Sequence, residues 1–254
     1  MTNQKALAPI DRLKATINMP SVQEQFRNAL ADTAPLFIAS LIDLYGSDNY
    51  LQNCEPKEVI MEALKAATLR LPINKSLGFA FVVPFRDPDG KQRPQMQIGY
   101  KGFLQLAMRT GQYRCINADV IYEGEFVGSD RLTGGIDLSG TKKSDRVVGY
   151  FAHLETVNGF RKTTWATKDD VLAHAERFSK SFKKKGSPWQ SHTDAMGIKT
   201  MLRRLLGKYG IMSVEMQQAL ATESDEQHSP ESEESGEVID IEPEKQEETR
   251  GPSF

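Results

Sequence analysis

The sequence predicts an α+β fold, in which N-terminal helices precede a short, mainly antiparallel sheet with hairpins, and a long C-terminal helix belongs to the core. Apolar residues recur at helical spacing from residue 21 to residue 71, and short strand-like runs then alternate with helical ones. Two glycine-containing pairs, Asp89-Gly90 and Asn158-Gly159, separate strand-like runs and are typical of hairpin turns. Helices followed by hairpin-linked strands favour an antiparallel sheet over a parallel one.

The N-terminal part predicts three helices, at residues 21–32, 35–46 and 55–71. Ser21 is a candidate N-cap for the first of them, whose apolar residues Val22, Phe26 and Leu30 are four residues apart. The second has a proline in its first turn and a glycine at its exit. The first 20 residues are polar, and we expect them to form a flexible N-terminus.

The middle of the chain changes to strand-like periodicity. Strands are expected at residues 79–85, 94–100, 115–126, 146–156 and 160–167. A short amphipathic helix follows the Gly-Tyr-Lys-Gly sequence at 99–102, and another begins after Thr167, with Asp169 and Asp170 in its first turn. One long helix is expected at 187–210, where it ends at a glycine.

Charge divides the chain into two unlike parts. Residues 222–254 hold 12 acidic and 2 basic residues, a net charge of −10, which leaves 22 acidic and 30 basic residues, a net charge of +8, in residues 1–221. The C-terminal part is rich in Glu and Ser and nearly free of aromatic residues, which is typical of disorder. We therefore expect a flexible N-terminus (1–20), a basic core domain (21–221) and an acidic disordered tail (222–254). The tail would compete with an anionic ligand, bind partners or only add solubility.

Several classes of protein are disfavoured by what the sequence lacks. The two cysteines are far apart and match no metal or redox spacing, so we expect no metal site. The N-terminus lacks the apolar run of a signal peptide, and no run of apolar residues approaches the ~20 needed to cross a bilayer. These features favour a cytoplasmic protein that has no membrane partner.

The sequence also offers little for catalysis. Neither Gly90-Lys91 nor Gly207-Lys208 has the serine or threonine and the upstream glycine of a P-loop, so we expect no ATP site and no cofactor. If the ligand is a nucleic acid, magnesium would act only on that ligand. The four histidines form no metal-binding or nucleophile motif. The paired carboxylates at 169–170 fit a helix N-terminus, although a catalytic use stays open as an alternative.

Two segments have the chemistry of an anion-binding surface. In the first, Lys101, Gln105 and Arg109 are four residues apart and form a polar stripe along one helical face. The flanking Gly99 and Gly102 have no side chains, so a ligand strand could approach the backbone closely. The alternative is a solvated helix face with ordinary turn glycines. Within this segment we expect Tyr100 to face the ligand and Phe103 to belong to the core.

The second segment, residues 177–189, alternates cations with aromatic rings. Its basic members are Arg177, Lys180, Lys183, Lys184 and Lys185, and its aromatic members are Phe178, Phe182 and Trp189. Cations neutralise phosphates and ring faces stack bases, which contributes about 1–3 kcal/mol per base in single-strand binding. In the final helix, Lys199 and Arg203 lie one turn apart beside the apolar face. The alternative is a flexible basic loop with a core tryptophan.

Four segments in order make the chain resemble the RecT family of phage and prophage single-strand annealing recombinases. They are "LPINKSLGFAFVVPF", "QIGYKGFLQLAMRTGQY", "INADVIYEGE" and "SPWQSHTDAMGIKTMLRRLL". The chain departs from the family pattern at Gly197, where alanine or a basic residue is more common before the Lys-Thr step. A glycine there costs about 1 kcal/mol of helix propensity against alanine.

The resemblance implies ATP-independent binding and annealing of complementary single strands by a ring-shaped or filamentous homo-oligomer, without covalent chemistry. It also implies a fold distantly like that of ring-forming annealing proteins, and a phage exonuclease and the host single-strand-binding protein as partners. The alternatives are a duplex-DNA-binding regulatory protein without annealing activity, and an enzyme. The residues expected to bind DNA are Arg70, Lys75, Arg86, Gln97, Tyr100, Lys101, Arg109, Arg114, Arg177, Lys180, Lys183, Lys184, Lys185, Trp189, Lys199, Arg203 and Arg204. Lys101, Arg109 and Arg114 would together grip the phosphates of one strand.

Overall fold

The computed structural model of the chain describes residues 7–86, 89–179, 181–183, 185–211, 213 and 217. Helices fill the N-terminal part and three small antiparallel sheets with further helices follow, which confirms the predicted α+β class. The elements are α1 (Pro9–Ile17), α2 (Pro20–Leu30), η1 (Ala31–Thr33), α3 (Ala34–Ser47), η2 (Leu51–Asn53), α4 (Pro56–Thr68), β1 (Ala80–Arg86), β2 (Gln92–Ile98), α5 (Tyr100–Arg109), β3 (Tyr113–Tyr122), β4 (Gly128–Ser129), β5 (Ile136–Asp137), β6 (Val147–Thr156), β7 (Arg161–Thr167), α6 (Lys168–Phe178), α7 (Pro188–Ser191) and α8 (Thr193–Tyr209).

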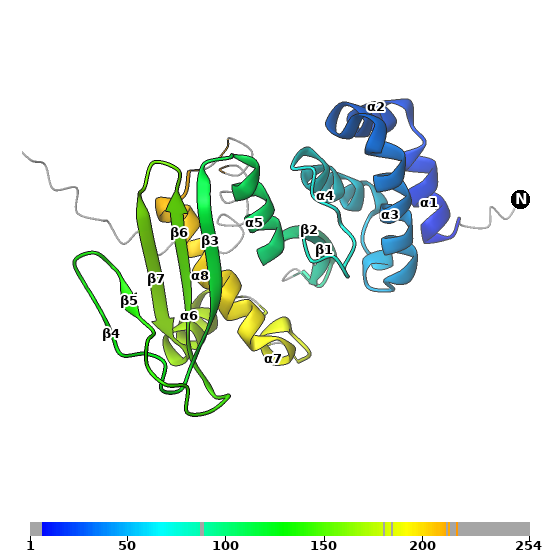
Figure 1. The fold of residues 1–254 in the computed structure, drawn as a ribbon. Helices are drawn as coiled ribbons and strands as arrows, with labels where there is room; N and C mark the ends of the chain where they lie inside the picture. Colours follow the sequence, from blue (N-terminus) through cyan, green and yellow to red (C-terminus); the bar gives the residue numbers. More distant parts are fainter. Residues whose placement is uncertain are drawn as a thin grey trace, which may run out of the picture.

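Helices α1 to α4 pack together at one end of the molecule (Figure 1). Each begins with a proline in its first turn, where the missing N–H costs no hydrogen bond. The first of them corrects the expectation of a flexible N-terminus over residues 1–20. Leu13 and Ile17 lie one turn apart on α1 and are 0% and 1% exposed, so burial of this apolar stripe holds the helix against the others.

One stretch of the described chain, Pro20–Ser47, is apolar and long enough to be a candidate membrane span, with a mean hydropathy of 1.2 over 18 residues. We expected no such stretch, because no run of apolar residues in the sequence approaches the ~20 needed to cross a bilayer. In the structure it comprises α2, η1 and α3, and the side chains of Phe26, Phe37 and Leu41 are buried in the core. In the described structure 28% of the 18-residue window is buried, and both core helices and signal sequences pass the same test of length and composition.

Strands β1 and β2 form the predicted hairpin, which packs against α4. Arg86 pairs with Gln92 next to the turn, and Gly90 in the connection has a φ of +80°, in the left-handed region that favours glycine. The second predicted hairpin is also confirmed: Gly159 has a φ of +87° between β6 and β7. Both glycine-containing pairs therefore form the hairpin turns that the sequence predicted.

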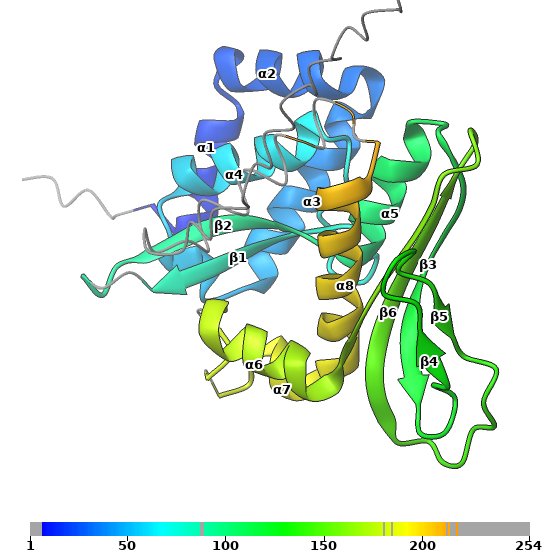
Figure 2. The same cartoon turned by 90° about the vertical axis from the view of Figure 1, so that its left-hand side faces the viewer.

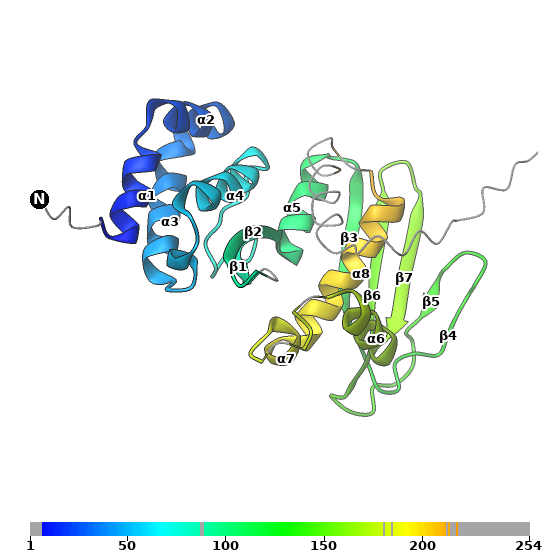
Figure 3. The same cartoon turned by 180° about the vertical axis from the view of Figure 1, so that it is seen from behind.

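The larger sheet has the strand order β3-β6-β7 and is antiparallel throughout. Successive side chains of β6 point to opposite faces, and Tyr150, Ala152 and Leu154 are 0% exposed on the inner face. Helix α8 lies across this face, as Figure 3 shows, and buries Leu202 and Leu205 against it. The sheet and α8 together form the second part of the core.

The long helix expected at 187–210 is divided. The backbone at His192 (φ −141°, ψ 48°) is not helical, so α7 ends at Ser191 and α8 begins at Thr193. Helix α6 precedes them, and Thr167 caps it by accepting a hydrogen bond from the backbone N–H of Asp170 at 3.1 Å. The small β4–β5 hairpin was not expected. The acidic segment 222–254 lies outside the described residues.

Candidate nucleic-acid interface

The glycines around Lys101 make room for the chain's own backbone. A Cβ atom on Gly99 would overlap the carbonyl oxygen of Gly78, and one on Gly102 would overlap that of Phe79. The backbone N–H of Gly99 also donates to Phe79 O at 2.9 Å. The expectation that these glycines admit a ligand strand is therefore wrong, because the segment entering β1 already occupies the space.

The residues between those glycines point outward at the N-terminus of α5. Tyr100 is 36% exposed and Lys101 is exposed, whereas Phe103 is 0% exposed, as predicted for a core residue. Among the described residues no side chain caps this helix, and its first turn holds no acidic residue. The free N–H groups of a helix start carry partial positive charge, so they and Lys101 favour an anion at this point.

Helix α8 continues the cationic surface next to α5. The Nζ atom of Lys199 lies 6.0 Å from the centroid of the buried Phe103 ring, which places this lysine against α5. Arg203 follows one turn later on the same helix, and both side chains are half-buried. Their aliphatic stems pack on the helices while the charges can reach the surface.

Helix α6 adds two residues to this surface, and one of them was missed in the sequence. His174 lies within the electrostatic influence of Arg204, Arg203 and Arg177, and the centroid of its ring lies 4.7 Å from that of Phe178, with the two rings tilted at 42°. Burial, followed by the three guanidinium groups, lowers the pKa of the imidazole below its usual value. We call His174, Arg177, Arg203 and Arg204 the α6–α8 cluster.

A sequence signal for His174 exists, because His174, Arg177 and Phe178 have the i, i+3, i+4 spacing of one helical face. The proximity of Arg203 and Arg204 has no such signal, because these residues follow His174 by 29 and 30 positions in the sequence. Figure 2 shows the α6–α7 pair and the β1–β2 hairpin on the same side of α8. The cationic residues of α5 and α6 thus lie on helices that both pack against α8.

The basic segment 177–185 and Trp189 behave differently from one another. Lys183 pairs with Glu176 at 2.9 Å, but both side chains are more than half exposed, so the pair contributes little. Lys185 is exposed, and Lys180 and Lys184 lie outside the described residues. Trp189 is only 6% exposed, donates its Nε1–H to Ser179 Oγ at 3.2 Å and offers no free face to a base. The core-tryptophan alternative describes it better than base stacking.

Arg70 and Arg109 meet at the C-terminal end of α4. Arg109 donates to Leu69 O at 2.6 Å and to Arg70 O at 2.8 Å, which satisfies carbonyls that the helix leaves free. Burial and the charge of Arg70 lower the pKa of Arg109. Arg70 itself has a φ of +51°, and the bonds Arg70 N–Ala67 O (2.8 Å) and Leu71 N–Ala66 O (3.0 Å) form a Schellman motif. The exposed Arg70 therefore adopts a left-handed backbone conformation that glycine would adopt without strain.

The remaining predicted residues are dispersed. Lys75 pairs with Asp48 at 2.7 Å, while Arg86 and Gln97 lie on the β1–β2 hairpin. Arg114 pairs with Glu155 at 3.1 Å on the face of the sheet away from α8. The expected grip of Lys101, Arg109 and Arg114 on one strand is therefore not assembled. Lys101 lies at the start of α5, the guanidinium of Arg109 binds carbonyls at the end of α4, and Arg114 lies on the outer sheet face.

Comparison with known proteins decides what kind of chain carries this surface. A family model described as "RecT family" matches residues 36–240. The chain belongs to the RecT family. The match spans most of α3 and all elements from α4 to α8, so every described residue of the cationic surface lies within it. Membership gives the chain a role in DNA recombination by single-strand annealing, as the four ordered segments implied.

Two relatives illustrate the extent of the family likeness. The uncharacterized protein YqaK of Bacillus subtilis (strain 168) is 44% identical over 245 residues, which cover 95% of this chain and 83% of the relative. Protein RecT of Escherichia coli (strain K12) is 30% identical over 223 residues, which cover 83% of this chain and 79% of the relative. RecT-family annealing proteins do not act as conventional enzymes. Within the described residues, no three His, Cys, Asp or Glu side chains come together as a metal site.

Proposed function

We propose that this RecT-family chain binds single-stranded DNA on the surface formed by the start of α5, the exposed side of α8 and the C-terminal turn of α6, and anneals complementary strands without ATP. The observation that carries the proposal is the convergence of Arg203, Arg204 and Arg177 around His174. Arg203 and Arg204 lie on the same helix α8 that places Lys199 against α5, whose start at Lys101 has no side-chain cap among the described residues. A phosphodiester backbone is the ligand that matches such a surface.

The chemistry requires no reading of sequence by the protein. Cations from α5, α6 and α8 neutralise phosphates and fix the position of the strand, while pairing between the two strands supplies specificity. Adjacent subunits of a homo-oligomer, as a ring or a helical filament, would extend the surface from one subunit to the next and keep the bases of the first strand outward. The exposed basic residues Lys183 and Lys185 would close over the strand as a flap.

The test is an annealing assay with two complementary oligonucleotides, one of them labelled, in the absence of nucleotide and over a series of salt concentrations. We expect the protein to accelerate duplex formation, and the acceleration to fade as salt rises, because counterion release drives binding. Tight single-strand binding without acceleration would refute the annealing role.

The variants Lys101→Ala and Arg203→Ala locate the surface. Each is expected to weaken binding of all sequences equally and to reduce the slope of log K against log salt by about 1. Lys14→Ala, an exposed lysine of α1 in the N-terminal helices, is the matched control and should leave the slope unchanged. An unchanged slope for Lys101→Ala and Arg203→Ala would remove these residues from the proposed surface.

The family also suggests how the chain would work in a cell. We propose that it acts in the cytoplasm of a bacterial host, next to a phage exonuclease that supplies single strands and the host single-strand-binding protein that coats them. The alternative of a duplex-binding regulator would show a strong preference for double-stranded over single-stranded DNA. Competition between the two DNA forms in a binding assay separates the two functions.

A further inference from the structure

The outer face of the β3-β6-β7 sheet, turned away from α8, has a pocket of about 410 Å³ under the β4–β5 hairpin. The alternation of side chains along β6 explains its composition, because Phe151, His153 and Glu155 point outward between the buried residues of the inner face. Ile136 and Leu138 form the wall contributed by the hairpin. Its volume lies within the range of ligand sites for small organic molecules.

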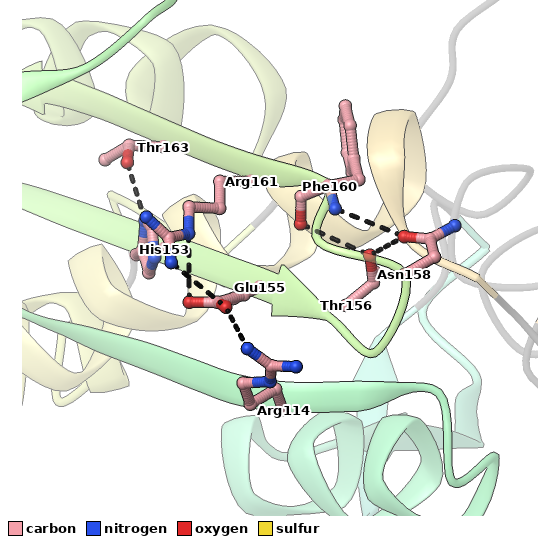
Figure 4. Close-up of polar contacts among 8 residues, drawn as sticks. All are labelled: Arg114, His153, Glu155, Thr156, Asn158, Phe160, Arg161 and Thr163. Carbon is pink, nitrogen blue, oxygen red and sulfur yellow. Dashed lines mark hydrogen bonds and ion pairs between the residues drawn. The ribbon is translucent and has the colours of Figure 1, made fainter.

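The polar floor of the pocket is fixed. His153 and Thr163 are cross-strand neighbours, and His153 Nδ1 lies 2.8 Å from Thr163 Oγ1, which sets the orientation of the ring (Figure 4). Within the described parts of the chain, Nε2 of His153 has no hydrogen-bond partner, so it is the group left to meet a ligand. Lys162 ties the hairpin to the sheet by donating from Nζ to Thr133 O at 3.0 Å.

Arg161 lines the pocket, and Glu155 holds it together with a second arginine, Arg114, which lies outside the pocket lining. Arg161 contacts Glu155 through Nε and Nη2, at 3.1 and 3.2 Å, and Arg114 contacts it through Nη1 at 3.1 Å. The three charges sum to +1, and the arginine side chains are 67% and 63% exposed whereas that of Glu155 is 13% exposed. Their other N–H groups can bind an oxyanion in a geometry that Glu155 has already set (Figure 4).

Aromatic surface completes the set. Phe151 lines the pocket, its cross-strand neighbour is Trp165, and the ring of Trp165 lies 4.4 Å from that of Phe126. An apolar ligand would leave Nε2 of His153 and the guanidinium groups unused, and a small oxyanion would leave the apolar walls uncovered. A planar ring with a phosphate matches all three features together.

We infer that this pocket binds one nucleotide, with its base against Phe151 and His153 and its phosphate at Arg161 and Arg114. The nucleotide is either free in solution or part of a DNA strand. In the second case the inference rests on the proposed function and adds a nucleotide contact on the opposite face of the sheet from the α6–α8 cluster. One subunit could then contact nucleic acid on both sides.

The experiment titrates the full-length chain with deoxyadenosine monophosphate (dAMP), deoxyadenosine, inorganic phosphate and a single-stranded 12-mer. Trp165 and Trp189 are the two tryptophans of the chain, so Trp189→Phe makes Trp165 a local fluorescence probe. Calorimetry on the unmodified chain gives a second readout. We expect saturable binding of dAMP, weaker binding of deoxyadenosine and phosphate, and about tenfold losses in His153→Ala and Arg161→Gln.

Arg146→Gln and His192→Ala, two exposed residues outside the pocket, should bind dAMP as the unmodified chain does. Binding of the 12-mer is compared between Arg203→Ala and the double variant Arg203→Ala/His153→Ala. Weaker binding by the double variant shows that the bound nucleotide is part of a strand. If the pocket binds dAMP but His153→Ala leaves 12-mer binding unchanged, the ligand is a free nucleotide. Equal affinity for phosphate and dAMP would overturn the inference, as would pocket variants that bind dAMP normally. Because dAMP binding needs no annealing, failure of one proposal is distinguishable from failure of the other.

Discussion

Substitution of Gly197 by alanine is expected to destabilise the protein although it improves helix propensity. Gly197 is buried in α8, directly over the ring of Tyr150 in β6. A Cβ atom at residue 197 would lie 2.5, 2.6 and 2.7 Å from three atoms of that ring. Carbon atoms attract at about 3.5–4.0 Å, so helix or ring would have to move by about 1 Å.

The ring cannot move freely, which sets the size of the effect. Tyr150 is 0% exposed and donates from its hydroxyl to Asp194 Oδ1 at 2.7 Å, one turn before Gly197 on the same helix. Burial and the contact with Asp194 raise the pKa of the Tyr150 hydroxyl well above its usual value, so the hydroxyl stays a donor. Overpacking of a core costs about 1–3 kcal/mol, and alanine returns about 1 kcal/mol of propensity. The expected net loss is about 0–2 kcal/mol.

Gly207 provides the matched control on the same helix. It is exposed, and a Cβ atom there would meet nothing within 4 Å, so Gly207→Ala should gain up to about 1 kcal/mol. Urea unfolding, followed by circular dichroism, measures the free energy of unfolding of both variants. The comparison holds if m, the slope of that free energy against urea concentration, is the same for both. The reasoning requires Gly197→Ala to be about 1–3 kcal/mol less stable than Gly207→Ala. Equal stabilisation by the two substitutions would refute it, as would an unchanged difference in a Tyr150→Ala background.

Arg70→Gly is expected to raise the free energy of unfolding by about 1 kcal/mol, because glycine adopts the left-handed conformation without strain; urea unfolding should show this gain. Arg109→Ala should lower the same free energy by about 1.5–3 kcal/mol through loss of two charged hydrogen bonds, and a loss of DNA binding without loss of stability would contradict this structural role. His174→Gln tests pH dependence. The folded-state pKa of His174 is lowered from 6.5, so the unfolded chain binds the proton more readily and stability falls as pH drops below 6.5. A bound phosphate raises that pKa again, so strand affinity should increase on acidification; His174→Gln should remove both effects, and His192→Gln neither.

Local sequence predicted most of the helices and strands and the turns of the β1–β2 and β6–β7 hairpins. The change of apolar period from helical to alternating marks where strands begin, and glycine at residues 90 and 159 supplies the positive φ of the two hairpins. Helical spacing also placed Phe103 in the core and put Lys199 and Arg203 together on α8. The same rules were sufficient for α1, whose Leu13 and Ile17 are one turn apart, but the polar composition around them concealed the pattern.

Tertiary structure alone decided what the functional candidates contact. Gly99 and Gly102 pack against the backbone carbonyls of residues 78 and 79. Arg109 binds carbonyls at the end of α4, and Arg114 pairs with Glu155 on the outer sheet face. Each of these contacts joins segments more than 20 residues apart, and such contacts leave no periodic signal in the sequence. Composition could identify a basic chain with an acidic tail, but only the packing of α5 and α6 on α8 brings the cations to one surface.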